Sequence, residues 1–430
     1  MFLPLLLLFS AAFASAIVAY GTHPVWAQYR HGLSLILFAR QFEWPLAALA
    51  LVLCVTVVAL VVAGKRRAWW LIGLGPVLAL FVHRYQTDPL RDFYILANPA
   101  FVPAVQASFM AGDDYVVGVV FEGSAYAYPY FALYSAPVVF QTEHDRRMIL
   151  MWSAFANRAV AWQVNRAYHP RDLEIISMPA NALLVYNVKL GQFINGLTGC
   201  TPAGQKPEGF LSSMPVQKVT WRQWASWYPT TQVLVPPGGV PRQKVPNAPL
   251  RPWFPYPPIT GTPPAESAIV LLETPSPQAI LPQLVKANPM NLSVGGIPML
   301  VFRDRATGRV RAFDRRVEDL TLKFKLNTDA RRKQAVLVDL DTNSGWLTDG
   351  RPIDGPMAKA GKRLQPINVD EFVYWGVMKT WMPQLQLVTV EPTSPVVVDQ
   401  AGSVGGETKE GSSRVRTGST GRRRSSGGRR

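Results

Sequence analysis

Two short acidic segments carry side-chain types that acid–base catalysis uses. Asp113 and Asp114 form the first of them. In the second, Glu143, His144 and Asp145 place an imidazole between two carboxylates, which could transfer protons if buried. Adjacent loop residues point in different directions, and two arginines follow directly, so we expect a solvated charged turn. A hydrolytic cleft using Asp113, Asp114, Glu143 or His144 is the alternative, and we assign no catalytic residue.

A third segment matches part of a calcium-binding loop. Asp339, Asp341 and Asn343 would supply oxygen ligands at the first, third and fifth positions of such a loop. The pattern then fails, because Gly345 comes one position late and the twelfth position is Gly350 instead of glutamate. A hairpin turn with local side-chain hydrogen bonds explains the same residues, so we assign no metal ligand.

The other reactive side chains lack a partner at a recognisable spacing. Cys200 has no histidine or aspartate so placed, and we expect an incidental loop thiol. The chain has two cysteines and five histidines, too few and too scattered for a four-ligand zinc site. A phosphate-binding glycine loop, a dinucleotide fingerprint and a Gly-x-Ser-x-Gly motif are all missing from the sequence, so we expect no cofactor.

Tryptophans recur at three-residue spacing near residue 224. Trp221, Trp224 and Trp227 could stack on sugar rings if they were exposed. Helical spacing next to an apolar strand is more typical of a buried helix face. The same stripe returns later in the chain as Phe372, Trp375, Met378 and Trp381, which favours the buried interpretation.

The repeated stripe belongs to a longer internal similarity. Residues 148–162 align with residues 299–313, and Asn157 occupies the place of Gly308. Both residue types accept a left-handed turn. The offset grows only slightly toward Trp221 and Trp375, as in a duplicated domain with small loop insertions. Alternation of β-branched and aromatic residues predicts strands in the first copy near residues 115–121, 148–152, 158–164, 173–177 and 183–189.

Several motifs in the two copies are shared with a known family. They are residues 113–120, the Ala-Tyr-Pro at 127–129, residues 309–314, the Asp-Gly-Pro at 354–356, and the closing tryptophan segments. As a set they are similar to the bacterial domain of unknown function 3179, in two tandem divergent copies. The resemblance covers roughly residues 95–390, most of the chain outside its N-terminal apolar segments.

The resemblance also implies polar positions that this chain has replaced. Typical members place a His-Glu pair shortly after the Tyr-Pro, and two closely spaced cysteines at the end of the next strand. Here the first position holds Ala136 and Pro137, and the cysteine segment holds residues 152–155 in one copy and 303–306 in the other. If those polar residues perform chemistry in the family, we expect this chain to have lost it.

The N-terminal region contains segments that fit a lipid bilayer. Residues 2–20 form an uncharged apolar run, and residues 44–63 form a second run followed by the basic residues 65–67. Residues 68–82 form a third, shorter run. The apolar patch at 33–39 is too short to span a bilayer, and we expect it at the membrane interface.

The basic residues 65–67 predict the orientation of this region. Short basic loops stay in the cytoplasm, so three spans would place everything after residue 84 outside it. Losing the third span would reverse that result. We therefore expect a protein of the bacterial inner membrane whose β-rich modules face away from the cytoplasm.

The chain thus divides into five regions by composition. Residues 236–264 hold 11 of the 37 prolines and should form a semi-rigid linker that avoids sheet interiors. The predicted regions are a membrane region at 1–84, a first module at 85–235, the linker at 236–264, a second module at 265–392 and a disordered tail at 393–430.

The tail is the most basic part of the sequence. Eight lysines and arginines stand against two glutamates in residues 401–430. Without interleaved aromatics it lacks the stacking groups of a specific nucleic-acid binder. We expect contact with lipid headgroups or an anionic envelope polymer through Arg422, Arg423, Arg424, Arg429 and Arg430.

Taken together, these patterns predict a mainly β protein with short helices (α+β), built as two tandem β-rich modules behind a membrane-helix region. The missing catalytic motifs favour a membrane-anchored binding or scaffolding protein of the bacterial envelope without catalysis. Two alternatives remain open. One is an envelope-acting hydrolase with an acidic and histidine-lined cleft. The other is a nucleic-acid binder facing the cytoplasm through its basic tail.

Overall fold

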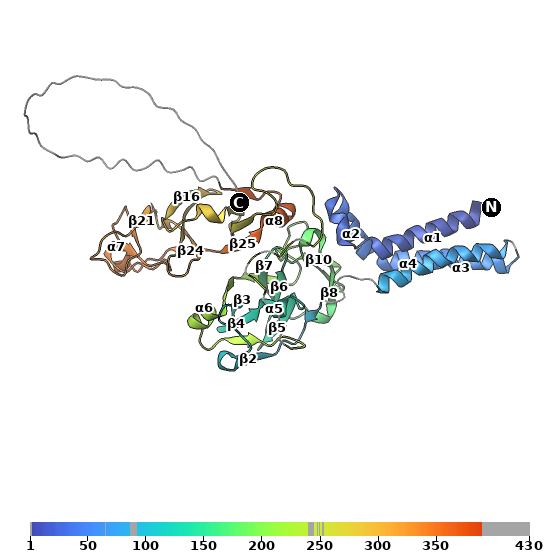
Figure 1. Cartoon of the computed structure of the whole chain (residues 1–430), viewed down its shortest axis with the longest axis horizontal. Helices are drawn as coiled ribbons and strands as arrows, with labels where there is room; N and C mark the ends of the chain where they lie inside the picture. The colour runs from blue at the N-terminus through green and yellow to red at the C-terminus, as the bar shows by residue number, and fades with distance from the viewer. Residues whose placement is uncertain are drawn as a thin grey trace, which may run out of the picture. The chain divides into compact units, whose positions relative to one another are not determined.

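The N-terminal region consists of helices, drawn in blue in Figure 1. In this computed structural model, residues 2–388 are described except 65, 87–92, 240–244, 247, 249 and 252. The tail at 393–430, with its five expected arginine contacts, lies outside the described residues, as does Lys65. The helices are α1 (Phe2–Tyr20), η1 (Pro24–Gln28), α2 (Gly32–Gln41), α3 (Glu43–Val62), η2 (Ala68–Gly73) and α4 (Leu74–Gln86).

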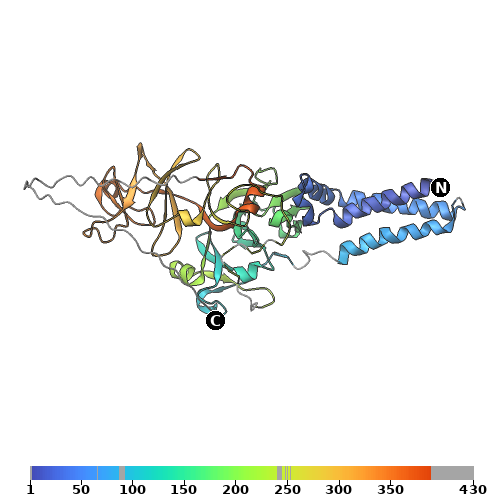
Figure 2. The ribbon, with the colours of Figure 1, turned by 45° about the horizontal axis from the view of Figure 1, so that its top comes forward.

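Helix α1 packs against both α3 and α4 (Figure 2). Two helices, α1 and α3, are long and apolar enough to cross a membrane. Both expose large apolar side chains, among them Phe9 at 70% and Leu51 at 65%. The expected third segment is shorter, and it is divided into the 3-10 helix η2 and the α-helix α4.

Helix α2 connects the N-terminal helices to the β-rich part of the chain. Its Ile36 side chain is fully buried in one cluster with Ala180 and Leu184 of the first module. Arg40, at the end of α2, forms ion pairs with Glu43 and with Glu174. The apolar patch at 33–39 therefore buries part of its surface against protein.

The first module contains three small sheets, as its alternating apolar segments predict. Their orders are β12-β3-β4-β13-β2, β1-β5-β6-β7-β11 and β10-β9-β8. The first sheet is built from β2 (Phe101–Pro103), β3 (Tyr115–Phe121), β4 (Ser124–Pro129), β12 (Val216–Thr220) and β13 (Gln232–Leu234). The second is built from β1 (Ile95–Leu96), β5 (Val138–Glu143), β6 (Arg146–Ser153), β7 (Arg158–Val164) and β11 (Phe210–Met214). The third is built from β8 (Leu173–Ser177), β9 (Leu184–Asn187) and β10 (Gln192–Asn195).

Short helices complete the first module. They are η3 (Ala104–Gln106), α5 (Tyr130–Leu133), η4 (Pro170–Asp172), η5 (Pro179–Asn181) and α6 (Trp221–Trp227). Thr220 directly precedes helix α6 and caps it, because its hydroxyl accepts a hydrogen bond from the Gln223 amide. Its Trp224 packs so tightly on β3 that a methyl group added to Gly118 would lie 2.4 Å from the indole ring. Glycine at 118 therefore makes room for the helix.

The second module has sheets of orders β25-β14-β15-β26, β16-β17-β18-β24 and β21-β22-β23, and a short β19–β20 hairpin. The strands of the first two sheets are β14 (Ala268–Leu272), β15 (Gln278–Ile280), β16 (Met290–Val294), β17 (Ile297–Arg303), β18 (Val310–Asp314), β24 (Gln365–Ile367), β25 (Val369–Tyr374) and β26 (Gln386–Leu387). The remaining elements are η6 (Pro282–Leu284), β19 (Arg316–Val317), β20 (Leu320–Thr321), β21 (Phe324–Leu326), β22 (Leu337–Asp339), β23 (Gly345–Trp346), α7 (Gly355–Lys359) and α8 (Trp375–Trp381). The fold is thus β-rich with short helices, as predicted.

The two modules share a strand order. The first module contains a sheet with the order β12-β3-β4-β13, and the second contains one with the order β25-β14-β15-β26. In each sheet the strand at one edge, β12 or β25, leads directly into the tryptophan-containing helix, α6 or α8. In both, the last two of these four strands pair in parallel while the other neighbours are antiparallel. Strands β5-β6-β7-β11 likewise correspond to β16-β17-β18-β24. The internal similarity in sequence therefore coincides with a similarity in topology.

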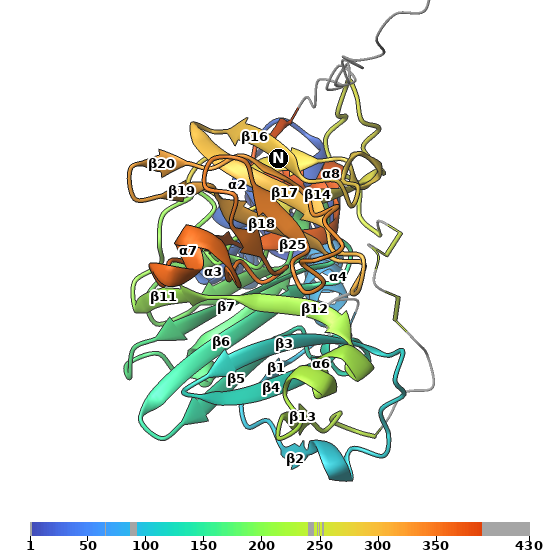
Figure 3. The ribbon, with the colours of Figure 1, turned by 90° about the vertical axis from the view of Figure 1, so that its left-hand side faces the viewer.

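The modules also share an apolar core. Ala156, Ala182 and Leu197 of the first module lie in one buried cluster with strands β14 and β25 and helix α8 of the second. Strands β12 and β25 are in contact (Figure 3). Buried apolar surface between the modules stabilises their packing, so the modules are joined by a shared core as well as by the linker.

The described part of the proline-rich linker follows the protein surface without forming a strand. The Asn181 side chain accepts hydrogen bonds from the Trp253 and Phe254 amides and donates one to the Phe254 carbonyl. The Phe254 ring is buried in the core of the first module, and Tyr256 packs with Tyr374 of the second. These contacts hold the linker against both modules.

Candidate functional site

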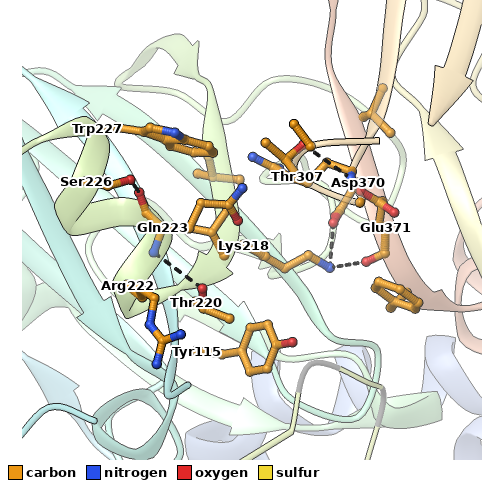
Figure 4. A pocket seen from close by; sticks show the side chains of 17 residues that line it. Tyr115, Lys218, Thr220, Arg222, Gln223, Ser226, Trp227, Thr307, Asp370 and Glu371 are labelled. Carbon is orange, nitrogen blue, oxygen red and sulfur yellow. Dashed lines mark hydrogen bonds and ion pairs between the residues drawn. The ribbon is translucent and has the colours of Figure 1, made fainter. Parts of the chain in front are cut away.

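A cleft lies where the two modules meet. Strand β12 and helix α6 form one wall, and β25 and the turn between β17 and β18 form the other. The cleft has a volume of about 670 Å³, within the usual range for small-molecule sites. Figure 4 shows side chains from both modules projecting into it, among them Trp227, Lys218 and Asp370.

A buried ionic cluster forms the floor of the cleft. The ammonium group of Lys218 lies 2.5 Å from one carboxylate oxygen of Asp370, and the Arg158 guanidinium lies 2.8 Å from the other. Arg158 also pairs with Glu273 at 2.8 Å. Lys218 further donates to the carbonyls of Asn157 and Glu371. The ammonium group of Lys218 therefore has two carbonyl acceptors and one paired carboxylate, and two of these three groups belong to the second module.

The charges in this cluster depend on one another. Burial lowers the pKa of Lys218, while the neighbouring Asp370 carboxylate acts in the opposite direction. Burial alone would also lower the pKa of Arg158, but Glu273 and Asp370 raise it above its ordinary value. Asp370 is the anion that both cations share, so its carboxylate links Lys218 and Arg158 of the first module to the second.

A bulge in β25 positions the two acidic residues of the cleft. The pairing of β25 with β14 shifts register between Val373 and Glu371, and Phe372 has a positive φ of 58°. A bulky residue rarely adopts this conformation. The Phe372 carbonyl accepts a hydrogen bond from the Asn157 side chain at 3.2 Å, and Asn157 has its own positive φ of 49°. The strained Phe372 of the second module thus meets the left-handed turn residue Asn157 of the first at the floor.

The second acidic residue, Glu371, is also engaged. One of its oxygens lies 3.3 Å from the Arg303 guanidinium, and the other accepts a hydrogen bond from the Val310 amide at 2.9 Å. Both oxygens of this carboxylate are therefore engaged by groups of the second module itself.

Arg309 crosses the cleft from the second module to the first. Its guanidinium donates to the Gln217 side-chain oxygen at 3.2 Å and lies 5.6 Å from the centre of the Trp227 ring. Burial lowers the pKa of Arg309 and the neighbouring Arg311 lowers it further, while the Glu371 and Asp370 carboxylates act in the opposite direction. This cation contacts a neutral amide and an aromatic ring in the place where Arg158 has carboxylates.

The acidic residues proposed for a hydrolytic cleft do not meet in this site. Asp114 closes a local turn by accepting from the Ala111 amide at 2.7 Å. His144 is the exposed tip of the β5–β6 hairpin, with a side chain 84% accessible and a positive φ of 50°. Neither Asp113 nor Glu143 lines the cleft between the modules. Residues 143–145 form the charged turn that the sequence predicts, between strands β5 and β6.

Glu143 instead stabilises a tyrosine. It accepts a hydrogen bond from the Tyr126 hydroxyl at 2.7 Å, and burial together with this carboxylate raises the pKa of Tyr126 to about 12. The folded state therefore keeps a proton that the unfolded state loses near pH 10. We expect the free energy of unfolding to fall between pH 10 and 12, and to fall less steeply in Tyr126→Phe. Chemical denaturation at several pH values measures this slope. Equal slopes in the two proteins would contradict the assignment.

The partial calcium motif forms a hairpin turn. Asp339 is fully buried at the end of β22, and its oxygens accept hydrogen bonds from the Thr342 and Ser344 amides and from the Trp346 indole. Asp341 is exposed and accepts from the Lys323 amide. Among the described residues, no group of three or more histidine, cysteine or acidic side chains is placed to hold a metal ion.

The remaining candidates have structural contacts. Cys200 is half-buried beside Thr198, and burial raises the pKa of its thiol, which disfavours the nucleophilic thiolate. Trp224 is buried and its indole donates to Thr231, as the helix-face interpretation predicts. Trp227 differs, because it faces the cleft and contacts Arg309.

The positions that are polar in typical family members come together in space. The Trp152 amide donates to the Pro137 carbonyl at 2.8 Å. Both residues, with Ser153 and Phe155, line a cavity of only about 10 Å³. This volume is about that of a single water probe. A mainly apolar set of side chains, with Ser153 and Asn181 among them, therefore closes the place where the resemblance implies histidine, glutamate and cysteine.

Sequence reasoning missed the residues of the cleft. Arg158 and Arg309 each follow a left-handed turn residue, Asn157 or Gly308, at equivalent places in the two copies. That equivalence could have identified them. A lysine directly before Val219 in a predicted β segment was a second signal, because Lys218 must find a counterion when buried.

Comparisons with other proteins place the chain in a family. No curated protein and no solved structure matches it. A family described as "Protein of unknown function (DUF3179)" matches residues 95–384, which is more than half of the chain, in one continuous stretch that includes both modules and the cleft. The chain therefore belongs to the DUF3179 family.

Proposed function

We propose that this protein is a membrane-anchored binding protein of the bacterial envelope, whose family domain lies outside the cytoplasm and binds its ligand in the cleft between the modules. The observation that carries the proposal is the cleft itself. Its floor is held by the Lys218–Asp370–Arg158 cluster, and its carboxylates are engaged in ion pairs. Such a preformed site favours binding over hydrolysis.

The arrangement of the helices supports the membrane anchor. Helix α3 has a length of roughly 30 Å, which matches the hydrocarbon thickness of a bilayer. The 3-10 helix η2 rises more per residue than an α-helix, so η2 and the apolar part of α4 together cover roughly 25 Å. The third segment is therefore closer to a full span than its residue count suggests.

The ends of the helices support the orientation. Tyr20 at the end of α1 contacts His83 of α4, with ring centres 4.8 Å apart, and Glu43 at the start of α3 lies 3.7 Å from Arg84. The end of α1, the start of α3 and the end of α4 thus lie together. The basic loop with Arg66 lies between α3 and η2, at their other ends. A cytoplasmic basic loop would place the modules on the opposite side.

We further infer that the two modules arose by duplication and now act as the halves of one family domain. The shared strand order, the equivalent turns at Asn157 and Gly308, and the seven-residue tryptophan helices support a duplication. The single family match across both modules, together with their shared apolar core, supports the function of the pair as a unit.

Cysteine labelling in cells tests the orientation. Two variants are made in a background that carries Cys200→Ser. In the first, His144→Cys places a new thiol on the exposed hairpin. In the second, Gly64→Cys places a thiol next to the basic loop without removing a charge. With the outer layer permeabilised and the inner membrane intact, we expect a membrane-impermeant maleimide to label only His144→Cys. Labelling of Gly64→Cys alone would overturn the orientation and favour a cytoplasmic ligand.

A further inference from the structure

We propose that the cleft binds a small anionic ligand, one that carries a carboxylate or a phosphate, and that Arg309 contacts its charge. This inference rests on the binding function proposed above and names the class of ligand. It is drawn from a comparison of the two arginines at equivalent positions in the modules.

Arg158 and Arg309 occupy the same place in the two halves but have different partners. Arg158 is buried with two carboxylates, each 2.8 Å from its guanidinium. Arg309 contacts Gln217 and Trp227, and no described carboxylate forms an ion pair with it. The Glu371 and Asp370 carboxylates act on the partly buried Arg309, but each of them is already paired with another cation. An incoming anion would give the Arg309 guanidinium a direct charged partner of its own.

The charges around the cleft also favour an anion. Three cationic side chains line the cleft against two carboxylates; they are Lys218, Arg222 and Arg309 against Asp370 and Glu371. Both carboxylates are also paired with an arginine behind the lining, Asp370 with Arg158 and Glu371 with Arg303, so positive charge is in excess. Low-dielectric walls concentrate such a field toward the cleft.

The form of the cleft limits the ligand to a small molecule or one residue of a polymer. The volume of about 670 Å³ suits such a ligand. The Trp227 ring and the hydroxyl side chains of Thr220, Ser226 and Thr307 line it, as Figure 4 shows, and Arg309 belongs to the same lining. A guanidinium binds a carboxylate or a phosphate through two parallel hydrogen bonds, so both anions fit Arg309.

Anion titration of the purified full chain in detergent tests the proposal. Phosphate and sulfate represent one anion class, citrate and glucuronate represent the other, and glucose is the neutral control, all at constant ionic strength. We expect at least one anion to raise the Tm of the wild type in a saturable way. Arg309→Gln should raise the apparent Kd about tenfold or more, because a charged hydrogen bond is lost. Arg309→Lys should retain part of the response.

Arg316→Gln is the matched control, because Arg316 is half-exposed and paired with Asp314 in the same module, away from the cleft. It should respond as the wild type does. The proposal is overturned if no anion stabilises the wild type more than glucose, or if Arg309→Gln and Arg309→Lys both respond as the wild type does. The labelling experiment does not involve Arg309, so failure of the orientation and failure of the anion site are separate results.

Discussion

Replacing Asp370 by asparagine is expected to destabilise the protein by about 3–5 kcal/mol, the usual effect of removing one partner from a buried ion pair. The substitution keeps the size of the side chain and removes the negative charge that Lys218 and Arg158 share. Arg158 retains Glu273, but Lys218 is left among carbonyl oxygens without a counterion. The free energy of unfolding of the purified chain in detergent, from urea denaturation, measures the effect.

The pH dependence of Asp370→Asn gives a second signature. A buried lysine without an anion has a lowered pKa, so the folded state binds fewer protons than the unfolded state. Stability must then increase as the pH rises toward the ordinary lysine pKa. We expect part of the loss at pH 7 to be recovered at pH 9. The double variant Lys218→Met/Asp370→Asn should recover stability at both pH values, because no buried ammonium remains.

Asp145→Asn is the control for this experiment. Asp145 also pairs with an arginine, Arg166, at 2.6 Å, but both side chains are more than 70% exposed. Exposed pairs contribute about 0–1 kcal/mol, so this variant should be close to the wild type. If Asp370→Asn were no less stable than Asp145→Asn, the ionic cluster would not be what holds the two halves together.

The elements of the first module were predictable because their signals are local. Strands β3, β7 and β8 have the predicted bounds, and helix α6 covers the predicted tryptophan stripe. Alternation of side chains and helical spacing are set by neighbours in sequence, so the positions of these elements can be predicted without knowing their tertiary contacts. The β-rich fold class followed from these elements.

The cleft was not predictable in the same way, because it depends on contacts between residues far apart in sequence. Lys218 and Asp370 lie in strands of different modules, and the bulge at Phe372 that presents Asp370 is invisible in the residue pattern. Sequence reasoning predicted a charged turn around His144, and that residue lies on an exposed turn. The prediction succeeded because a turn is local, whereas no local pattern joins Lys218 of β12 to Asp370 of β25.

Replacing Asp339 by alanine is the second large effect we expect, about 3–5 kcal/mol of lost stability. The buried carboxylate accepts hydrogen bonds from the Thr342 amide at 2.5 Å, the Ser344 amide at 3.1 Å and the Trp346 indole at 2.8 Å. Each buried donor left without an acceptor costs about 1–3 kcal/mol. The loss is measured by urea denaturation, with Trp346 in the affected core as a fluorescent reporter.

Asp341→Ala separates this structural role from calcium binding. Asp341 belongs to the same partial motif but is exposed and accepts one backbone hydrogen bond, from Lys323, so its loss should change stability by less than about 1 kcal/mol. A calcium loop would make both aspartates necessary for a calcium-dependent increase in Tm. Because the Asp339 oxygens already accept three buried donors, we expect calcium and a chelator to leave the Tm unchanged. A calcium-dependent increase that both substitutions abolish would establish the loop as a metal site.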